Sequence, residues 1–191
     1  LDDGTYILQI GALGPDLPYA SIADNNLLRT SNDLADKFHY EQTNGVPLSA
    51  MRRLRESNAN VSDRQARHAF CFFLGYISHI IADGTIHPYV RDMVGDYAQN
   101  KDDHRALEMK LDVLFYHYLT IKSGAGLELS SSHLQDILAN AKDSAEMRRI
   151  VELFAEAIKE VYGTSYSADE ILGWIMGLHR MFDLASGNFL K

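Results

Sequence analysis

Apolar residues recur at helical spacing along most of the chain beyond residue 50. The clearest case is the stretch 62–83, which opens with a Ser-x-x-Gln capping box formed by Ser62 and Gln65. No segment of any length alternates between apolar and polar residues as a half-buried strand does. The pattern therefore predicts an all-α fold, built as a single multi-helix domain over residues 1–191.

The other helices are predicted from capping residues and from the glycines that end them. Asp143 is predicted to cap a helix that Gly163 ends, and Ser167 with Glu170 forms a second capping box. Three of the four prolines fall among the first fifty residues, so this part is predicted to be the most irregular. The predicted helices besides 62–83 cover residues 32–40, 48–56, 103–121, 130–141, 143–163 and 167–184.

Composition places the chain among globular proteins and narrows the chemistry open to it. Apolar residues make up 46% and charged residues 23% of the 191 residues, which excludes the disordered and fibrous classes. The net charge of −8 argues against a protein that binds nucleic acid through a broad basic face, so no stable nucleic-acid complex is expected. The single cysteine, Cys71, excludes a multi-thiolate zinc site, and any metal would be held by nitrogen and oxygen ligands.

Two further features bear on where the protein acts. The longest largely apolar run, residues 69–77, is about half as long as a membrane span, so no transmembrane segment is predicted. No targeting signal is visible in a sequence whose first residue is Leu1. We expect a cytoplasmic protein, with a secreted protein as the alternative.

His79, Asp83 and His87 stand four residues apart and would share one face of a continuous helix. On such a helix His79 and His87 would lie about 12 Å apart along the axis, too far for one zinc ion with bonds to nitrogen of about 2.0–2.1 Å. The spacing therefore predicts either two neighbouring metal ions or a helix that breaks at Gly84. Gly84 and Pro88 favour the break.

A second group of candidate ligands follows in the run HRALEMKLD. His104 and Glu108 are four residues apart on a predicted helix, a spacing at which two side chains can hold one ion. Asp112 continues the same face and is predicted to orient a histidine through a hydrogen bond. A single pair of this kind is most often structural, but both groups fall within 34 residues, so the spacing leaves a metal centre and a structural role equally open.

Four short segments resemble those of a known family. The run FFLGYISHIIADGTIHPY resembles the core motif of the zinc-dependent phospholipases C, which are related to the S1/P1 nucleases and to the catalytic domain of glycosylphosphatidylinositol-specific phospholipase D. GALGPDLPY, KFHYEQT and HRALE resemble the family's Gly-Pro-Asp segment, its next histidine segment and its His-x-x-x-Glu pair. The matches follow the family's order over residues 11–112.

The resemblance implies a fold of the phospholipase C/P1 nuclease type, with a polar cleft that holds two or three zinc ions, and hydrolysis of phosphate esters. Asp83 would bridge toward a third ion, and Asp16 would also be the general base. On this basis Asp83→Asn and His104→Ala are each expected to abolish metal-dependent hydrolysis. Carried over by position, the ligands would be Asp16, His39, His79 and Asp83 for one ion and His87, His104 and Glu108 for another.

The sequence departs from the family's pattern in two places. The family supplies a third zinc site through a histidine on an N-terminal helix, but none of the fifteen residues before Asp16 is a histidine, so we expect that helix to be missing here. Either the helix belongs to the full-length protein or the third site is lost. The spacing HxxxDxxxH also replaces the HxxxDxxxxxH of the secreted bacterial phospholipases C. The shorter spacing resembles an uncharacterised branch of the family and leaves the substrate open.

The leading interpretation is a zinc-dependent phosphoric ester hydrolase that cleaves a phosphodiester, with a phospholipid as the expected substrate. Two alternatives stay open: an S1/P1-like nuclease, which would need base-stacking aromatic residues beside the metals, and a non-catalytic, metal-stabilised helical module. No lipid-binding β domain is visible, so tight membrane docking is not expected. The aromatic run Phe115, Tyr116 and Tyr118 is interpreted as core packing.

Overall fold

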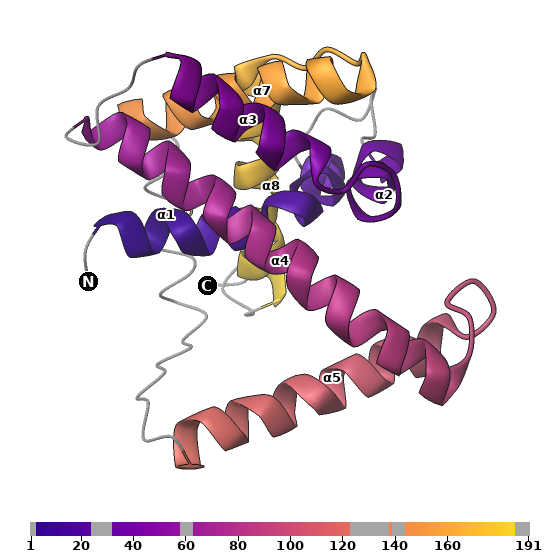
Figure 1. Cartoon of the computed structure of the whole chain (residues 1–191). Coiled ribbons are helices and arrows are strands. Elements are labelled where there is room, and N and C mark those ends of the chain that lie inside the picture. Colours follow the sequence, from indigo (N-terminus) through magenta and orange to yellow (C-terminus); the bar gives the residue numbers. More distant parts are fainter. Residues whose placement is uncertain (1–2, 24–31, 58–62, 123–137, 139–143, 186–191) are drawn as a thin grey trace. The chain divides into compact units, whose positions relative to one another are not determined.

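The computed structural model describes residues 3–23, 32–57, 63–122, 138 and 144–185 (Figure 1). Within these ranges every regular element is a helix, which confirms the predicted all-α fold. The chain divides into two compact units, a larger one of residues 1–80 and 131–191 and a smaller one of residues 81–130. The helix α4 (Arg64–Val94) contributes its first half to the larger unit and its second half to the smaller. A single domain over residues 1–191 stays a prediction.

The remaining elements follow in chain order. The larger unit also contains α1 (Asp3–Ala12), the 3-10 helix η1 (Gly14–Ala23), α2 (Asn32–Tyr40), α3 (Gly45–Glu56), α7 (Ala145–Tyr162) and α8 (Ala168–Ala185). In this unit α3 packs on α7, while α8 and α2 both pack on η1. The smaller unit contains α5 (Lys101–His117), which continues into the π-helical turn η2 (Tyr118–Lys122).

Two helices begin two residues later than predicted, and each is capped by the residue after the predicted cap. The Asp63 side chain accepts a backbone N–H in the first turn of α4 at 2.9 Å, whereas the predicted cap Ser62 lies outside the described residues. Similarly, Ser144 Oγ accepts a first-turn N–H of α7 at 3.2 Å, and the predicted cap Asp143 lies outside the described residues. In both cases an equally good capping residue follows the predicted one, so the sequence signal could not separate the two.

Several other predicted helix boundaries agree with the structure. Residues 32–40 form α2 as predicted, and Gly163 ends α7 with a φ of 70°. The capping box before α8 is confirmed, because Ser167 N–H donates to Glu170 Oε2 at 2.8 Å and Glu170 N–H donates to Ser167 Oγ at 3.2 Å. The predicted helix 103–121 corresponds to α5 with η2. Most of the predicted helix 130–141 lies outside the described residues.

The prediction of an irregular N-terminal part is wrong for the described residues there. Pro15 and Pro18 both lie in η1, because the fixed φ of proline suits a 3-10 helix. Pro47 lies in the first turn of α3, where its missing N–H would have no partner within the helix. That helix therefore starts at Gly45, three residues earlier than predicted.

The predicted helix break at Gly84 is also wrong, since α4 continues through both Gly84 and Pro88 to Val94. Pro88 cannot donate to the carbonyl four residues before it, which removes one bond from the helix ladder. The hydrogen bonds of the intact helical turns on either side outweigh the loss of this one bond. His79, Asp83 and His87 therefore stand on one continuous helix.

By length and composition alone, α4 is the one described helix that could cross a membrane, with a mean hydropathy of 1.4 over its most apolar 18-residue window. The core helix of a globular protein passes the same test. Three aromatic side chains of α4, Phe72, Phe73 and Tyr76, are fully buried inside the larger unit. Of that window 28% is buried, and a single helix that passes this test is weak evidence for a membrane span.

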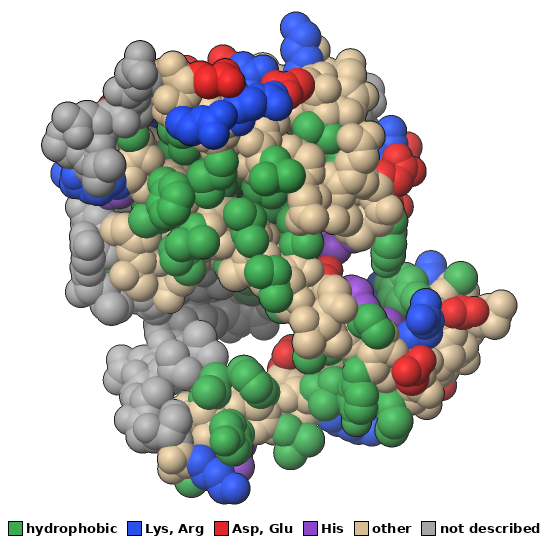
Figure 2. All heavy atoms as spheres, viewed as in Figure 1, with side chains coloured by type: hydrophobic (Ala, Val, Ile, Leu, Met, Phe, Trp, Pro, Cys, Tyr) green, Lys and Arg blue, Asp and Glu red, His purple; other side chains and the backbone are tan. Residues whose placement is uncertain are grey.

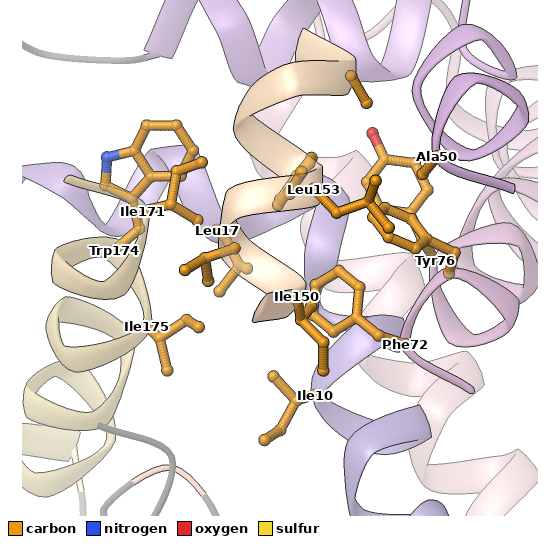
Figure 3. Packing of buried hydrophobic residues seen from close by; sticks show 14 of the residues in the cluster. Ile10, Leu17, Ala50, Phe72, Tyr76, Ile150, Leu153, Ile171, Trp174 and Ile175 are labelled. Atoms are coloured by element: carbon orange, nitrogen blue, oxygen red, sulfur yellow. The ribbon is translucent and has the colours of Figure 1, made fainter. Parts of the chain in front are cut away.

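An aromatic cluster joins three helices of the larger unit. The Phe154 ring of α7 lies 5.7 Å from Phe38 of α2 and 5.8 Å from both Phe72 and Tyr76 of α4, measured between ring centroids. Figure 3 shows Phe72 and Tyr76 among the buried aliphatic residues of this core. Offset and edge-to-face aromatic pairs add about 0.5–1.5 kcal/mol each beyond their area burial. The cluster therefore fixes α2 and α4 next to each other at the level of Phe38 and Tyr76.

Two glycines let α1 and α4 cross with their backbones in contact. A Cβ added at Gly11 would lie 2.0 Å from the Phe72 carbonyl oxygen, and one at Gly75 would lie 2.1 Å from the Leu8 carbonyl oxygen. Such separations are far below van der Waals contact, so neither position can carry a larger residue without moving a helix. This crossing places the C-terminal carbonyl of α1 against α4.

The smaller unit buries few large apolar side chains among its described residues. Phe115, Tyr116 and Tyr118 expose 64%, 44% and 54% of their surface, so their interpretation as core packing is wrong. Hydrophobic side chains, green in Figure 2, are visible along α5 at the bottom of the view.

An ion-pair network between α3 and α7 gives the larger unit an acid-sensitive contact. Glu160 Oε2 accepts from Arg53 at 2.8 Å and from Ser49 Oγ at 3.0 Å, and Glu160 Oε1 accepts from Arg52. These donors, Arg52 first, lower the pKa of Glu160 from 4.5 to about 2. Because the charged form is favoured in the folded state, the stabilisation is present above pH 4.5 and is lost as the pH falls toward 2.

We therefore expect Glu160→Gln to lower the urea midpoint at neutral pH, with a difference from the parent that shrinks as the pH falls from 4.5 to 2. Urea unfolding followed by circular dichroism across this range measures the difference. In an Arg52→Gln, Arg53→Gln background the same change should have a smaller pH-dependent effect, because only the Ser49 hydroxyl still donates to Glu160. A parent–variant difference that stays constant over the range would contradict the prediction.

Candidate metal centre

Asp16, His39 and His79 come together in the larger unit as the first triad, from η1, the last turn of α2 and the middle of α4. Their nearest ligand atoms all lie within 4.8 Å of one another. His39 Nε2 lies 3.3 Å from both His79 Nε2 and Asp16 Oδ1. His79 Nε2 lies 4.0 Å from Asp16 Oδ2. Segments separated by up to 63 positions in the sequence therefore converge on one point.

Backbone carbonyls fix the orientation of both histidine rings of the first triad. His39 Nδ1 lies 2.7 Å from the Ala35 carbonyl oxygen, and His79 Nδ1 lies 2.8 Å from the Ala12 carbonyl oxygen. A carbonyl only accepts, so each Nδ1 carries the proton and donates it. Each ring thereby turns its Nε2 toward the other, and the two Nε2 atoms lie 3.3 Å apart. A histidine whose Nδ1 donates to a backbone carbonyl while its Nε2 faces the site is typical of metal-binding histidines.

The separations within the first triad also suit a zinc ion. Two nitrogens bound tetrahedrally at about 2.0–2.1 Å stand about 3.3 Å apart, and this is the distance between His39 Nε2 and His79 Nε2. Without a cation or a shared proton, two lone pairs at this distance would repel each other. Two histidines and one carboxylate leave a fourth tetrahedral position open, as in catalytic zinc sites.

The first triad is shielded on its histidine side and open on its carboxylate side. The side chains of His39 and His79 expose 11% and 16% of their surface, against 45% for Asp16. The Tyr19 ring stands 6.1 Å from the His39 ring, and its hydroxyl donates to Asp36 Oδ1 at 2.6 Å. Burial and that carboxylate raise the pKa of Tyr19, so the hydroxyl stays protonated and keeps its bond. Asp16 is the member of the triad that solvent or a substrate can reach most easily.

His87 from α4 and His104 and Glu108 from α5 form the second triad, which lies within the smaller unit. Glu108 Oε1 lies 3.1 Å from both His87 Nε2 and His104 Nε2. Because His104 and Glu108 are one turn apart on α5, the helix itself sets their separation. As in the first triad, two imidazoles and one carboxylate converge.

His104 is the most buried member of the second triad and has an unpaired ring nitrogen. Its side chain is 6% exposed, and its Nδ1 has no hydrogen-bond partner among the described residues. The Tyr97 ring packs edge-on against it with 4.9 Å between ring centroids. Packing of this kind restricts the orientation of the ring, which aims Nε2 at Glu108.

The two remaining predicted site residues, Asp83 and Asp112, belong to neither triad. Asp83 lies one turn from His87 on α4, with its Oδ1 3.9 Å from His87 Nε2. That contact places it beside the second triad, and its predicted role as a ligand with Asp16, His39 and His79 stays a prediction. Asp112 is exposed one turn beyond Glu108, and no hydrogen bond joins it to a histidine in the part of the chain that the structure describes, so its orienting role also stays a prediction.

Two features of the site could not be anticipated from the residue types. The carbonyls of Ala12 and Ala35 hold the histidine rings, and a backbone group leaves no mark in the sequence. Tyr97 packs on His104 from the segment between α4 and α5, where no motif points to it. Metal-binding histidines usually donate their second ring N–H to a nearby acceptor. This rule predicts that an acceptor exists, but it does not say which residue provides it.

Comparison with known proteins agrees with the geometry. The family model described as zinc-dependent phospholipase C matches residues 6–168, which include every member of both triads. No curated protein and no solved structure gave a match.

Proposed function

Because the chain belongs to the zinc-dependent phospholipase C family, we propose that it hydrolyses phosphodiester bonds of phospholipids with zinc bound at its two triads. The observation that carries the proposal is the pairing of two histidines and one carboxylate in each triad, with the imidazole nitrogens turned toward a common point. Two ions per chain, one for each triad, follow from this pairing.

Bound zinc would neutralise charge on the phosphate oxygens and lower the pKa of a bound water. The residues of the chain prepare the site for this chemistry. The Nδ1 atoms of His39 and His79 donate to backbone carbonyls, so the Nε2 atoms would be the ones that bind the ion. His87, His104 and Glu108 would hold the second ion through the two Nε2 atoms and the carboxylate. Each triad carries one negative charge, so a divalent ion would leave it net positive and suited to an anionic phosphodiester.

Asp16 is proposed as the general base. One of its carboxylate oxygens faces His39 and the other faces His79, and nearly half of the side chain is exposed. An oxygen that is not bound to metal could accept the proton of an attacking water. General bases of this kind contribute about 10²–10⁴-fold to the rate.

The test combines metal content with turnover. We expect inductively coupled plasma mass spectrometry to find two zinc ions per chain in protein purified without chelators or immobilised-metal columns. That protein should hydrolyse bis-p-nitrophenyl phosphate, and chelation should stop the reaction until zinc is restored. Asp16→Asn should lower kcat by about 10²–10⁴-fold.

Substrate class is tested separately, with phosphatidylcholine and single-stranded DNA. Release of phosphocholine without DNA cleavage would support a phospholipase, whereas the reverse result would support a nuclease. Protein that binds zinc but turns over neither substrate nor bis-p-nitrophenyl phosphate would contradict the proposal and favour a metal-stabilised module.

A further inference from the structure

The second half of α5 and the turn η2 carry an unusual concentration of exposed apolar side chains. We call residues 113–122 the apolar segment, and its sequence is VLFYHYLTIK. Val113, Leu114 and Phe115 are each 64% exposed and Ile121 is 66% exposed. Tyr116 and Tyr118 are 44% and 54% exposed. Surface residues of this kind are ordinary when scattered singly, but a contiguous group marks an interaction site.

The exposed side chains of the apolar segment surround the helix. Val113 and Tyr116 continue a row that begins at Met109, with spacings of four and three residues, whereas Leu114 and Tyr118 form a row on another face. A helix of a globular protein normally confines its apolar residues to one stripe. A helix end that is apolar on several faces is typical of a core element or an element that enters a membrane. The side chains named above are 44–66% exposed, and Figure 2 shows apolar side chains along α5 on the face in view.

The charges of the apolar segment favour a phospholipid surface. The chain as a whole carries 26 acidic against 18 basic residues, yet the apolar segment contains no aspartate or glutamate and ends at Lys122. The Lys122 ammonium lies over the Tyr118 ring, 5.5 Å from its centroid. Tyrosine and lysine side chains of this kind are common at the level of lipid headgroups, where an apolar body meets a polar, negatively charged layer.

We propose that the apolar segment docks this protein weakly and reversibly onto phospholipid bilayers. Its aliphatic and aromatic side chains would enter the interface between headgroups and acyl chains, with Lys122 facing lipid phosphates. Glu108 of the second triad lies seven residues before Phe115 on the same helix, about 10 Å along the axis. Docking would therefore bring the second triad to the level of the headgroup phosphates. The inference rests on the proposed phospholipase function only for this last step, since docking itself needs neither zinc nor turnover.

Cosedimentation of the full chain with vesicles of phosphatidylcholine and phosphatidylserine tests the proposal. We expect the parent to bind and added salt to weaken binding. Leu114→Ser with Phe115→Ser should lower the partition coefficient about a hundredfold, about tenfold for each side chain. Leu48→Ser with Met181→Ser is the matched control, because these side chains are 64% and 47% exposed on the larger unit. The control should bind vesicles like the parent.

A second variant and two other readouts separate the outcomes. Lys122→Gln keeps the apolar surface and should weaken binding about fivefold on vesicles with phosphatidylserine only. Circular dichroism and zinc content should match the parent in every variant. Three results would overturn the proposal: no vesicle binding by the parent, equal loss of binding in the control, or a dimer of the parent that the Leu114→Ser, Phe115→Ser variant abolishes without any vesicle binding. None of these results depends on hydrolysis, so vesicle binding can be measured and interpreted even if the protein is inactive.

Discussion

His79→Ala is expected to remove one zinc ion per chain and to lower phosphodiester turnover by more than about a hundredfold. Loss of a group that only orients a zinc ligand costs about 10–100-fold in affinity or activity, and loss of a ligand should cost more. His79 contributes one of the two facing Nε2 atoms of the first triad. Without it, His39 and Asp16 are left as a pair, which is too few to hold an ion firmly. Metal analysis and turnover of bis-p-nitrophenyl phosphate measure the two effects.

The chain offers a matched control in His179→Ala. His179 lies on α8 and pairs with Asp183, with 3.3 Å between Nδ1 and Oδ2, outside both triads. Its replacement should leave zinc content and turnover at the parent level. Equal zinc content in the His79→Ala variant and the parent would mean that the first triad does not bind the ion.

Gly75→Ala should destabilise the larger unit by about 3 kcal/mol or more, the upper range for overpacking a close contact. The added methyl group would lie 2.1 Å from the Leu8 carbonyl oxygen and 2.7 Å from the Ala12 amide nitrogen. Both are backbone atoms of α1, so no side-chain rotation can relieve the overlap. The helices must separate, and the free energy of unfolding in urea should fall accordingly.

Gly84→Ala tests the same substitution further along the same helix. A Cβ at Gly84 would meet no atom within 4 Å, so only the helix propensity changes. This variant should gain about 0.5–1 kcal/mol, the usual difference between alanine and glycine inside a helix. If the two variants had similar stabilities, the close crossing of α1 and α4 would be contradicted.

Helical periodicity predicted the fold class because it depends on residues that are near in sequence. The Ser167–Glu170 box and the stop at Gly163 are decided within one turn, and both are confirmed. The break at Gly84 was predicted from local preferences alone, and the continuous α4 overrides them. The prediction of irregular structure at Pro15 and Pro18 was wrong for the same reason. Proline disfavours an α-helix but is compatible with a 3-10 helix.

The ligand sets depend on contacts between distant segments. The spacing of His104 and Glu108 predicted a pair that the structure brings together at 3.1 Å. No periodicity in the sequence predicts that Asp16 and His39 lie next to His79. Only the resemblance to a family indicated that these residues form one site. The exposure of Phe115 could not be predicted either. The local sequence around an aromatic residue on a helix is the same whether or not another element covers it.

The carbonyls that orient the first triad have a consequence for how the site would look in a saturation scan of single substitutions. Ala12 and Ala35 hold the two histidine rings through main-chain oxygens that every amino acid carries. Ala12 is only partly buried, so many side chains should be accepted there, and the position would score as neutral. The scan would instead register losses at Gly11 and Gly75, which touch no ligand but let α1 approach α4 closely enough to keep the Ala12 oxygen in place. Ala35 is fully buried, so larger residues there would score as packing losses. The part that the Ala12 carbonyl plays in preparing this centre would thus be hidden from a side-chain survey, and two glycines would stand in for it.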